Sequence, residues 1–327
     1  MLLTGKTLAI TGVGGFIGLR MAELARERGM KVKGMDLSPQ AAKKAEALGV
    51  QVILGNVTDP KAAQKLCEGA DIVFHTAAIV SESDDWENIR KVNVGGTKVM
   101  AEAASRAGCS RLVHLSSVMV YGFDFPKYVT EEGPFRGENN PYCQTKIESE
   151  EEVLKFHKKN GLEVIIIRPG DVYGPGSLPW VVRPLQMMKR GMFALIDSGK
   201  GVMNHVYVDN LLDAVFLALE KDATGEAFNV TDGLATSWKD YWETLARIGG
   251  APKLRSVPSW AMRPALSLGE RIFKLLGREP PGNPAAIGFL TRPHPYSIDK
   301  ARKILGYSPK ISLEEGMRRT GEWLRGK

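Results

Sequence analysis

The sequence predicts an α/β protein with a doubly wound parallel sheet and a smaller, discontinuous C-terminal lobe. Short β-branched runs alternate with helical stretches through the first half of the chain, which is typical of strands joined by crossover helices. The runs are continuously hydrophobic rather than alternating, as in strands covered on both faces. After residue 168 the alternation of strands and helices ends, and clusters of Gly, Pro and Trp indicate a second, irregular part of the chain.

The expected elements follow in chain order. We expect strands at residues 7–11, 31–35, 51–54, 72–75, 112–116 and 164–168, and helices at 18–28 and 39–48 that end at Gly29 and Gly49. A helix at 210–219 and a strand at 227–230 are expected to return to the sheet. The first domain therefore spans residues 1–170 with a return at about 205–232, and residues 171–204 and 233–327 form the lobe.

Composition narrows the class of protein. A chain of 327 residues with 43% hydrophobic and 25% charged residues is ordinary for a soluble globular enzyme. No apolar run reaches the ~18 residues of a membrane span, and no signal-like segment precedes the first strand. Cys67, Cys109 and Cys143 are far apart in the chain, so neither a disulfide framework nor a metal site is expected. We expect a cytoplasmic protein.

The C-terminal quarter is basic. Residues 251–327 hold 15 Lys and Arg against 6 Asp and Glu, in a chain of net charge +7. No nucleic-acid-binding module accompanies this charge, so we expect a solvated basic surface and no nucleic-acid partner. Residues 260–277 place apolar side chains, among them Met262, Ile272 and Phe273, on one helical face. A lid or core packing is favoured for this segment, and contact with a membrane surface is the weaker alternative.

A glycine-rich turn lies between the first strand and the first helix. Residues 11–18 read Thr-Gly-Val-Gly-Gly-Phe-Ile-Gly. Gly12, Gly15 and Gly18 would allow a tight turn, close approach to a pyrophosphate and close packing of helix on strand. The N-terminus of the helix would face the anion. This arrangement predicts a Rossmann-type sheet that binds a dinucleotide.

Asp36 ends the second strand, 18 residues after Gly18. A carboxylate there would accept hydrogen bonds from the adenosine ribose hydroxyls and repel a 2′-phosphate. We therefore expect NAD rather than NADP as the cofactor. A helix cap is the structural alternative for Asp36, and Lys33 could soften the discrimination.

Tyr142 and Lys146 open a charged helix and share one of its faces. A nearby ammonium, together with the positive nicotinamide, would favour the phenolate and bring the pKa of Tyr142 from about 10 toward the working range. Ser117 ends an expected strand 25 residues upstream, where its hydroxyl could orient a substrate oxygen. These residues predict proton transfer at an alcohol or carbonyl.

In combination these motifs resemble the extended short-chain dehydrogenase/reductase family, within the NAD-dependent epimerase/dehydratase superfamily. The matching stretches are residues 11–18, 75–78, 93–97, 116–122, 142–146 and 168–176, in the family's order. Residues 205–210 and 296–307 look like the 3β-hydroxysteroid dehydrogenase branch. The resemblance also implies a homodimer through helices at 93–107 and 142–159.

The resemblance implies a role for each matching residue. Tyr142 would donate and accept the proton, Lys146 would bind the nicotinamide ribose and tune Tyr142, and Ser117 would polarise the substrate oxygen. The expected cofactor contacts are Gly12, Gly15, Phe16, Ile17, Gly18, Asp36, Asn56, Val57, Ala77, Ala78, Asn93, Ser116, Tyr142, Lys146, Pro169 and Val172. The family more often has Asp where Asn56 stands.

Two positions bear on the substrate. Nucleotide-sugar enzymes of the family hold a second diphosphate with an Asn and an Arg, where this chain has Asp171 and Val202. Charge-assisted phosphate contacts contribute ~1.5–3 kcal/mol each, so a nucleotide sugar should bind poorly here unless residues such as Arg183 or Arg190 compensate.

Three hypotheses remain. The first is an NAD-dependent oxidoreductase that interconverts a secondary alcohol and a ketone on a bulky apolar substrate, in the manner of a 3β-hydroxysteroid dehydrogenase. The second is a nucleotide-sugar 4-epimerase or dehydratase. The third is a non-catalytic NAD-sensing protein, which the presence of Ser117, Tyr142 and Lys146 disfavours.

Overall fold

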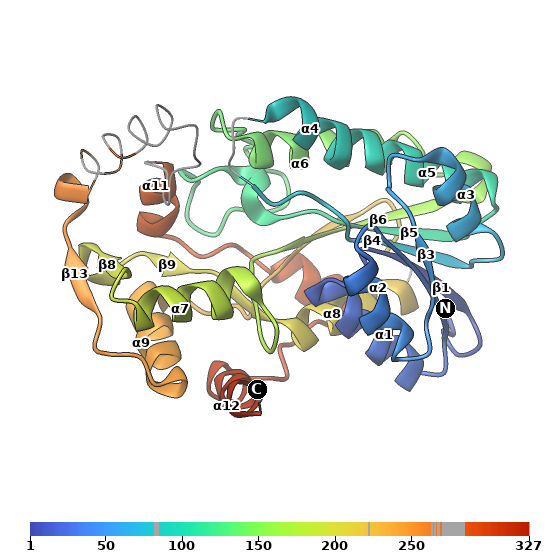
Figure 1. Ribbon diagram of the computed structural model, residues 1–327. Coiled ribbons are helices and arrows are strands. Elements are labelled where there is room, and N and C mark those ends of the chain that lie inside the picture. The colour runs from blue at the N-terminus through green and yellow to red at the C-terminus, as the bar shows by residue number, and fades with distance from the viewer. Residues whose placement is uncertain are drawn as a thin grey trace.

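The computed structural model describes residues 1–81, 85–221, 223–262, 264, 266, 269 and 285–326. Helices lie on both faces of one seven-stranded sheet (Figure 1), so the predicted Rossmann-type α/β fold is confirmed. All neighbouring strands of this sheet are parallel, in the order β11-β6-β5-β4-β1-β2-β3. The strands are β1 (Thr7–Thr11), β2 (Lys31–Asp36), β3 (Gln51–Leu54), β4 (Ile72–His75), β5 (Arg111–Leu115), β6 (Glu163–Pro169) and β11 (Ala227–Val230).

The strand order reverses between β1 and β4, so the connections leave in opposite directions there. In open α/β sheets this reversal opens a crevice at the carboxyl ends of the strands, which is where ligands bind. The glycine turn follows β1 directly. The fold therefore places that turn at the crevice.

Alternate residues of each strand face different helix layers. Leu8 and Ile10 pack with α1 (Phe16–Glu27) and α8 (Val208–Glu220), and α2 (Pro39–Glu46) lies on that side as well. Ala9 faces the opposite layer, which contains α3 (Pro60–Cys67), α5 (Gly96–Arg106) and α6 (Pro141–Leu154). Because both faces are buried, the strands are hydrophobic throughout.

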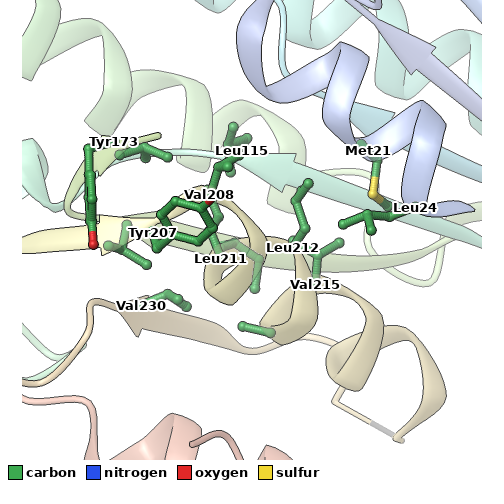
Figure 2. Close-up of a cluster of buried hydrophobic side chains, with 14 of the residues drawn as sticks. Met21, Leu24, Leu115, Tyr173, Tyr207, Val208, Leu211, Leu212, Val215 and Val230 are labelled. Atoms are coloured by element: carbon green, nitrogen blue, oxygen red, sulfur yellow. The ribbon is translucent and has the colours of Figure 1, made fainter. Parts of the chain in front are cut away.

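Helix α8 is largely apolar and packs against α1 on one face of the sheet. Figure 2 shows where it meets α1, through Met21, Leu24, Leu211, Leu212 and Val215. Burying each leucine side chain stabilises the fold by about 1.5–3 kcal/mol. This packing holds the middle of α1, the helix that follows the glycine turn, against α8.

The expected elements are present with small shifts. Helix α1 begins at Phe16 rather than residue 18, because Gly15 is its N-cap. Strand β5 ends at Leu115, one residue before the predicted end. The late return is confirmed, since β11 pairs with β6. The short helix α4 (Trp86–Arg90) runs into α5 through a π-helical turn, η1 (Lys91–Gly95), which the sequence pattern does not predict.

The remaining segments gather at one end of the sheet (Figure 1). Among the described residues they include the two-stranded pairs β7 (Asp171–Tyr173) with β10 (His205–Tyr207), β8 (Ala194–Ile196) with β13 (Arg255–Val257) and β9 (Val202–Met203) with β12 (Thr236–Ser237), and the helices α7 (Arg183–Lys189), α9 (Trp238–Gly249), α11 (Ala285–Thr291) and α12 (Leu313–Arg325). Most of the amphipathic segment predicted at 260–277 lies outside the described residues. Within the described ranges, none of the helices combines the length and apolar character needed to cross a bilayer.

Candidate functional site

The glycine turn has the geometry of a phosphate-binding turn. Gly12 adopts a φ of +65°, which favours glycine. A Cβ on Gly18 would collide with the carbonyl oxygen of Gly12, so the helix can approach the strand this closely only without a side chain. The N-cap Gly15 offers no side-chain acceptor to the first N–H groups of α1, which leaves them able to bind an anion.

Asp36 lies directly beside this turn. Its Oδ2 accepts from Gly14 N at 3.0 Å and its Oδ1 from Ser38 N at 3.0 Å. A carboxylate has about four acceptor positions, so lone pairs remain for ribose hydroxyls. Lys33 is held elsewhere, because its Nζ donates to the carbonyls of Lys65 and Glu68.

The loop after β4 forms the second wall of the crevice. Thr11 Oγ1 accepts from Ala77 N at 3.1 Å, and a Cβ on Gly12 would lie 3.3 Å from Ala77 Cα. The predicted contacts Ala77 and Ala78 therefore adjoin the glycine turn. Farther along, Asn56 Oδ1 accepts from Thr58 N at 3.0 Å and fixes the turn that carries Val57. The residues present fit a dinucleotide.

Asn93 lies in the π-helical turn and is 2% exposed. Its Oδ1 accepts from Ile79 N at 2.8 Å, and its Nδ2 donates to Ile79 O at 3.0 Å and to Thr145 Oγ1 at 3.1 Å. The amide thus ties the loop after β4 to α6. Its predicted contact with the cofactor stays a prediction.

Helix α6 begins with a strong local signal. Asn140 is the N-cap and its side chain accepts from Tyr142 N at 3.0 Å and Cys143 N at 3.1 Å, and Pro141 occupies the first turn. The cap places Tyr142 in the first turn and Lys146 one turn later, as predicted. Lys146 Nζ lies 5.8 Å from the Tyr142 ring centroid.

Ser117 comes to the same place from β5. It is the N-cap of the 3₁₀ turn η2 (Val118–Tyr121), where its Oγ accepts from Met119 N at 3.2 Å. Its side chain also hydrogen-bonds that of Tyr142. The structure thus brings together the three residues predicted to be catalytic: Ser117, Tyr142 and Lys146.

The pKa values of Tyr142 and Lys146 in the chain alone differ from those expected when NAD is bound. Burial raises the pKa of Tyr142 to about 12, against a smaller lowering by the Ser117 hydrogen bond. Burial also lowers the pKa of Lys146 to about 8, and the Glu150 charge opposes that shift. The predicted lowering of the Tyr142 pKa is therefore absent from the chain alone, because burial raises this pKa and the positive nicotinamide of that prediction is no part of the chain.

A buried ion pair beneath the site was missed by sequence reasoning. Glu150 binds Arg168 through two hydrogen bonds, Nε to Oε1 at 2.9 Å and Nη2 to Oε2 at 2.6 Å. The Ser116 hydroxyl donates to the same carboxylate, and its predicted cofactor contact stays a prediction. Extending the Tyr142–Lys146 face by one more helical turn would have found Glu150.

On the lobe side, Asp171 is only 4% exposed. Its Oδ2 accepts from Asn204 N at 3.1 Å and from the guanidinium of Arg292, which is 1% exposed. Arg292 Nε donates to Val202 O at 3.2 Å. Arg292 therefore joins the two positions singled out as substrate determinants, a contact across 121 residues of sequence that no local pattern signals.

Aromatic rings surround this ion pair. Trp180 stacks on Phe289 with centroids 5.8 Å apart, and Phe289 meets Phe123 edge to face at 6.2 Å. Phe123, Trp180 and Phe289 are half-buried. Arg292 Cζ lies 4.0 Å from the Phe289 centroid. We name this set, defined as Phe123, Trp180, Trp238, Trp242 and Phe289, the aromatic wall.

Two other expected cofactor contacts lie in β6 and β7, and their contact with the cofactor stays a prediction. Val172 in β7 is 8% exposed, and Pro169 ends β6. His205 uses both ring nitrogens within the protein: Nδ1 bonds Asp232 at 2.8 Å and Nε2 bonds Thr236 at 2.7 Å.

The sequence profile of the NAD dependent epimerase/dehydratase family matches residues 8–231. Among curated proteins, the chain is similar to the 2-alkyl-3-oxoalkanoate reductase of Stenotrophomonas maltophilia, with 31% identity over 327 residues that cover 95% of this chain and 97% of that protein. It is also similar to the 3 beta-hydroxysteroid dehydrogenase/Delta 5-->4-isomerase of Mycobacterium tuberculosis, with 28% identity and coverage of 96% and 88%.

Among solved structures, the chain is similar to the UDP-glucose 4-epimerase of Thermotoga maritima. The TM-score is 0.80 at 24% identity, and the match covers 98% of this chain and 99% of that one. A likeness at this identity shows the fold alone.

Proposed function

The chain belongs to the NAD dependent epimerase/dehydratase family, and on that premise we propose that it interconverts a secondary alcohol and a ketone on a bulky, largely apolar substrate. It is an NAD-dependent oxidoreductase. The glycine turn and Asp36 would hold NAD, which accepts or supplies a hydride when bound. The free acceptor positions of Asp36 favour NAD over NADP.

The observation that carries the substrate class is the aromatic wall. Phe123 follows Ser117 by six residues and faces Phe289, so the chain runs from the reacting group into the wall within a short segment. Its half-buried members offer apolar surface to a substrate, and each aromatic side chain contributes a large contact area. A sterol-like or long-chain ketone fits such a surface better than a sugar does.

The buried ion pair argues against a nucleotide sugar. Arg292 contacts both Asp171 and Val202, and its charge is already balanced by Asp171. A diphosphate placed there would have to compete with a buried carboxylate and would meet its repulsion. The pair therefore supports the first hypothesis over the nucleotide-sugar alternative.

The relatives agree with this class. One is named as a reductase of 2-alkyl-3-oxoalkanoates and the other as a dehydrogenase of 3β-hydroxysteroids. Both names describe a ketone or secondary alcohol carried on an apolar body. We propose the same class here, with residues 171–204 and 233–327 as the substrate side and residues 1–170 with about 205–232 as the NAD side.

We assign the proton steps to three residues. In ketone reduction Tyr142 donates its phenol proton to the substrate oxygen, and in alcohol oxidation the phenolate takes it back. Ser117, already hydrogen-bonded to Tyr142, orients the substrate oxygen beside the phenol. Lys146 supplies a positive charge near the ring that favours the phenolate as it forms.

The test is an assay of purified protein with NAD and a panel of 3β-hydroxysteroids, with NADH and a panel of 3-oxo compounds, and with UDP-sugars. We expect substrate-dependent change in NADH fluorescence with the apolar panels and no conversion of the sugars. The Phe289→Ala variant should raise KM for bulky ketones and leave KM for a small ketone unchanged. Sugar epimerisation without net NADH formation would overturn the proposal in favour of the epimerase alternative.

A further inference from the structure

Glu150 occupies a distinctive place below the site. It follows Lys146 by four residues, so Tyr142, Lys146 and Glu150 stand one above another on the same face of α6. Glu150 is 7% exposed, and its carboxylate is clamped by Arg168 at the end of β6 and by Ser116 at the end of β5. The clamp therefore joins α6 to the two strand ends that border the reacting group.

Lys146 is enclosed by charged and titratable groups on four elements. These are Tyr142 and Glu150 on α6, His75 on β4, His114 on β5, and on β6 Arg168, which binds Glu150. Lys146 itself is 4% exposed and its Nζ donates to Leu115 O at 2.8 Å. A buried ammonium requires a nearby negative charge to stay protonated.

His75 does not supply that charge and is neutral. Thr11 Oγ1 accepts the N–H groups of Thr76 and Ala77, so its own hydrogen points to His75 Nδ1 at 2.9 Å. Thr97 donates its hydrogen to Asn93 O, so His75 Nε2–H donates to Thr97 Oγ1 at 3.0 Å. Burial keeps the pKa of His75 low, at about 3.

His114 is neutral as well. Ser149 donates its hydroxyl hydrogen to Lys146 O, so His114 Nε2–H donates to Ser149 Oγ at 3.0 Å. Burial and the Lys146 charge hold the pKa of His114 well below its usual value. Among the described groups that face Lys146, Glu150 is thus the negatively charged one.

We propose that Glu150 is a positioning residue of this site, which supplies the negative charge that keeps Lys146 protonated and, through Arg168 and Ser116, fixes Lys146 against the ends of β5 and β6. Glu150 touches neither substrate nor cofactor in this scheme and acts through Lys146. Arg168 balances its charge and holds both carboxylate oxygens. The role in turnover rests on the proposed function, whereas the electrostatic role does not.

The first test needs no substrate. The folded pKa of Lys146 is about 8 against 10.5 for an ordinary lysine, so the unfolded chain binds more protons between these values and stability rises with pH across that window. Unfolding midpoints in urea, measured from about pH 6 to about pH 10, should show this rise as the difference between the natural chain and Lys146→Met. In a Glu150→Gln background, the difference in midpoint between the variants with and without Lys146→Met should begin to rise at a pH about one unit lower.

Glu148→Gln is the matched control. Glu148 lies on the same helix but binds Arg90 at the surface, at 2.8 Å, so its loss should leave the onset unchanged. If Glu150→Gln alone does not fold, Glu150→Gln/Arg168→Gln removes both buried charges together, which avoids an unpaired one, and should shift the onset in the same direction. An unchanged onset in either folded variant would overturn the proposal.

The second test uses turnover. Ketone reduction should fall as pH rises through about 8, where Lys146 loses its charge, and in Glu150→Gln the fall should begin about one unit lower. A variant that loses activity equally at every pH would show a purely structural role and would contradict the proposal. Absence of any turnover in the natural chain would instead refute the proposed function, and the stability test would still decide the role of Glu150.

Discussion

The glycine turn and the aromatic wall are specified in different ways. The turn is formed by consecutive residues after β1 and presents backbone N–H groups. The wall is assembled from α9, α11, the helical turn η4 (Leu178–Val182) and the loop after η2, and its cation Arg292 meets Asp171 from 121 residues away. The comparison teaches that the side that holds the cofactor is encoded locally, whereas the side that faces the substrate is encoded by tertiary contacts.

The largest expected effect lies between the two regions. Tyr142→Phe removes the phenol proton and should lower kcat for ketone reduction about 10²–10⁴-fold, the usual contribution of general acid catalysis. Stopped-flow or steady-state NADH fluorescence measures the loss. The urea midpoint should stay close to that of the natural chain, and retention of full turnover would place the proton donor elsewhere.

The second-largest effect tests the substrate side, which is specified by tertiary contacts. Arg292→Met leaves Asp171 buried without its counter-charge, and breaking a buried pair in this way costs about 3–5 kcal/mol of stability. Urea unfolding measures it. The double variant Asp171→Leu/Arg292→Met should recover most of the loss, since neither charge is then left unpaired. If the double variant were no more stable than the single one, the pair would not be the source of the effect.

The third effect tests the cofactor side, which is specified by consecutive residues of the chain. Gly18→Ala forces a Cβ against the Gly12 carbonyl oxygen, and overpacking of this kind costs about 1–3 kcal/mol. Because the displaced atoms form the turn, NAD affinity should fall about tenfold or more, as measured by titration calorimetry. Gly326→Ala, where a Cβ would meet only an ordinary contact at 3.7 Å, serves as the control and should bind NAD normally.

The smallest effect concerns cofactor choice. Asp36→Asn keeps an acceptor for Gly14 N but removes the charge that repels a 2′-phosphate, so the ratio of NAD to NADP affinity should fall about tenfold. Asp240→Asn removes one exposed charge in the first turn of α9, in the lobe, and should leave the ratio as it is. Equal ratios in the two variants would show that Asp36 does not select the cofactor.

The sequence was informative where the function depends on neighbours in the chain. The positions of Gly12, Asp36, Tyr142 and Lys146 follow from strand ends and helix starts, and the structure places them around one crevice. Asn140 shows why this worked for Tyr142, because a capping side chain and the following proline fix the start of α6.

Other features were beyond local patterns. Trp180 and Phe289 look like ordinary core residues in sequence, and their stacking arises only when α11 packs beside η4 (Leu178–Val182). The raised pKa of Tyr142 in the chain alone was not foreseen, because burial cannot be read from residue spacing. The π-helical turn at Asn93 likewise depends on contacts with Ile79 and Thr145.

The late return of β11 to the sheet has a consequence for engineering. The chain leaves the sheet after β6, builds part of the aromatic wall, re-enters as β11 beside β6, and leaves again toward α9. A chimaera with a relative therefore cannot exchange the whole substrate side at a single crossover. Two breakpoints before β11 and one after it are required. A chimaera with only the breakpoint after β11 would combine Trp180 from one parent with Trp238 and Arg292 from the other.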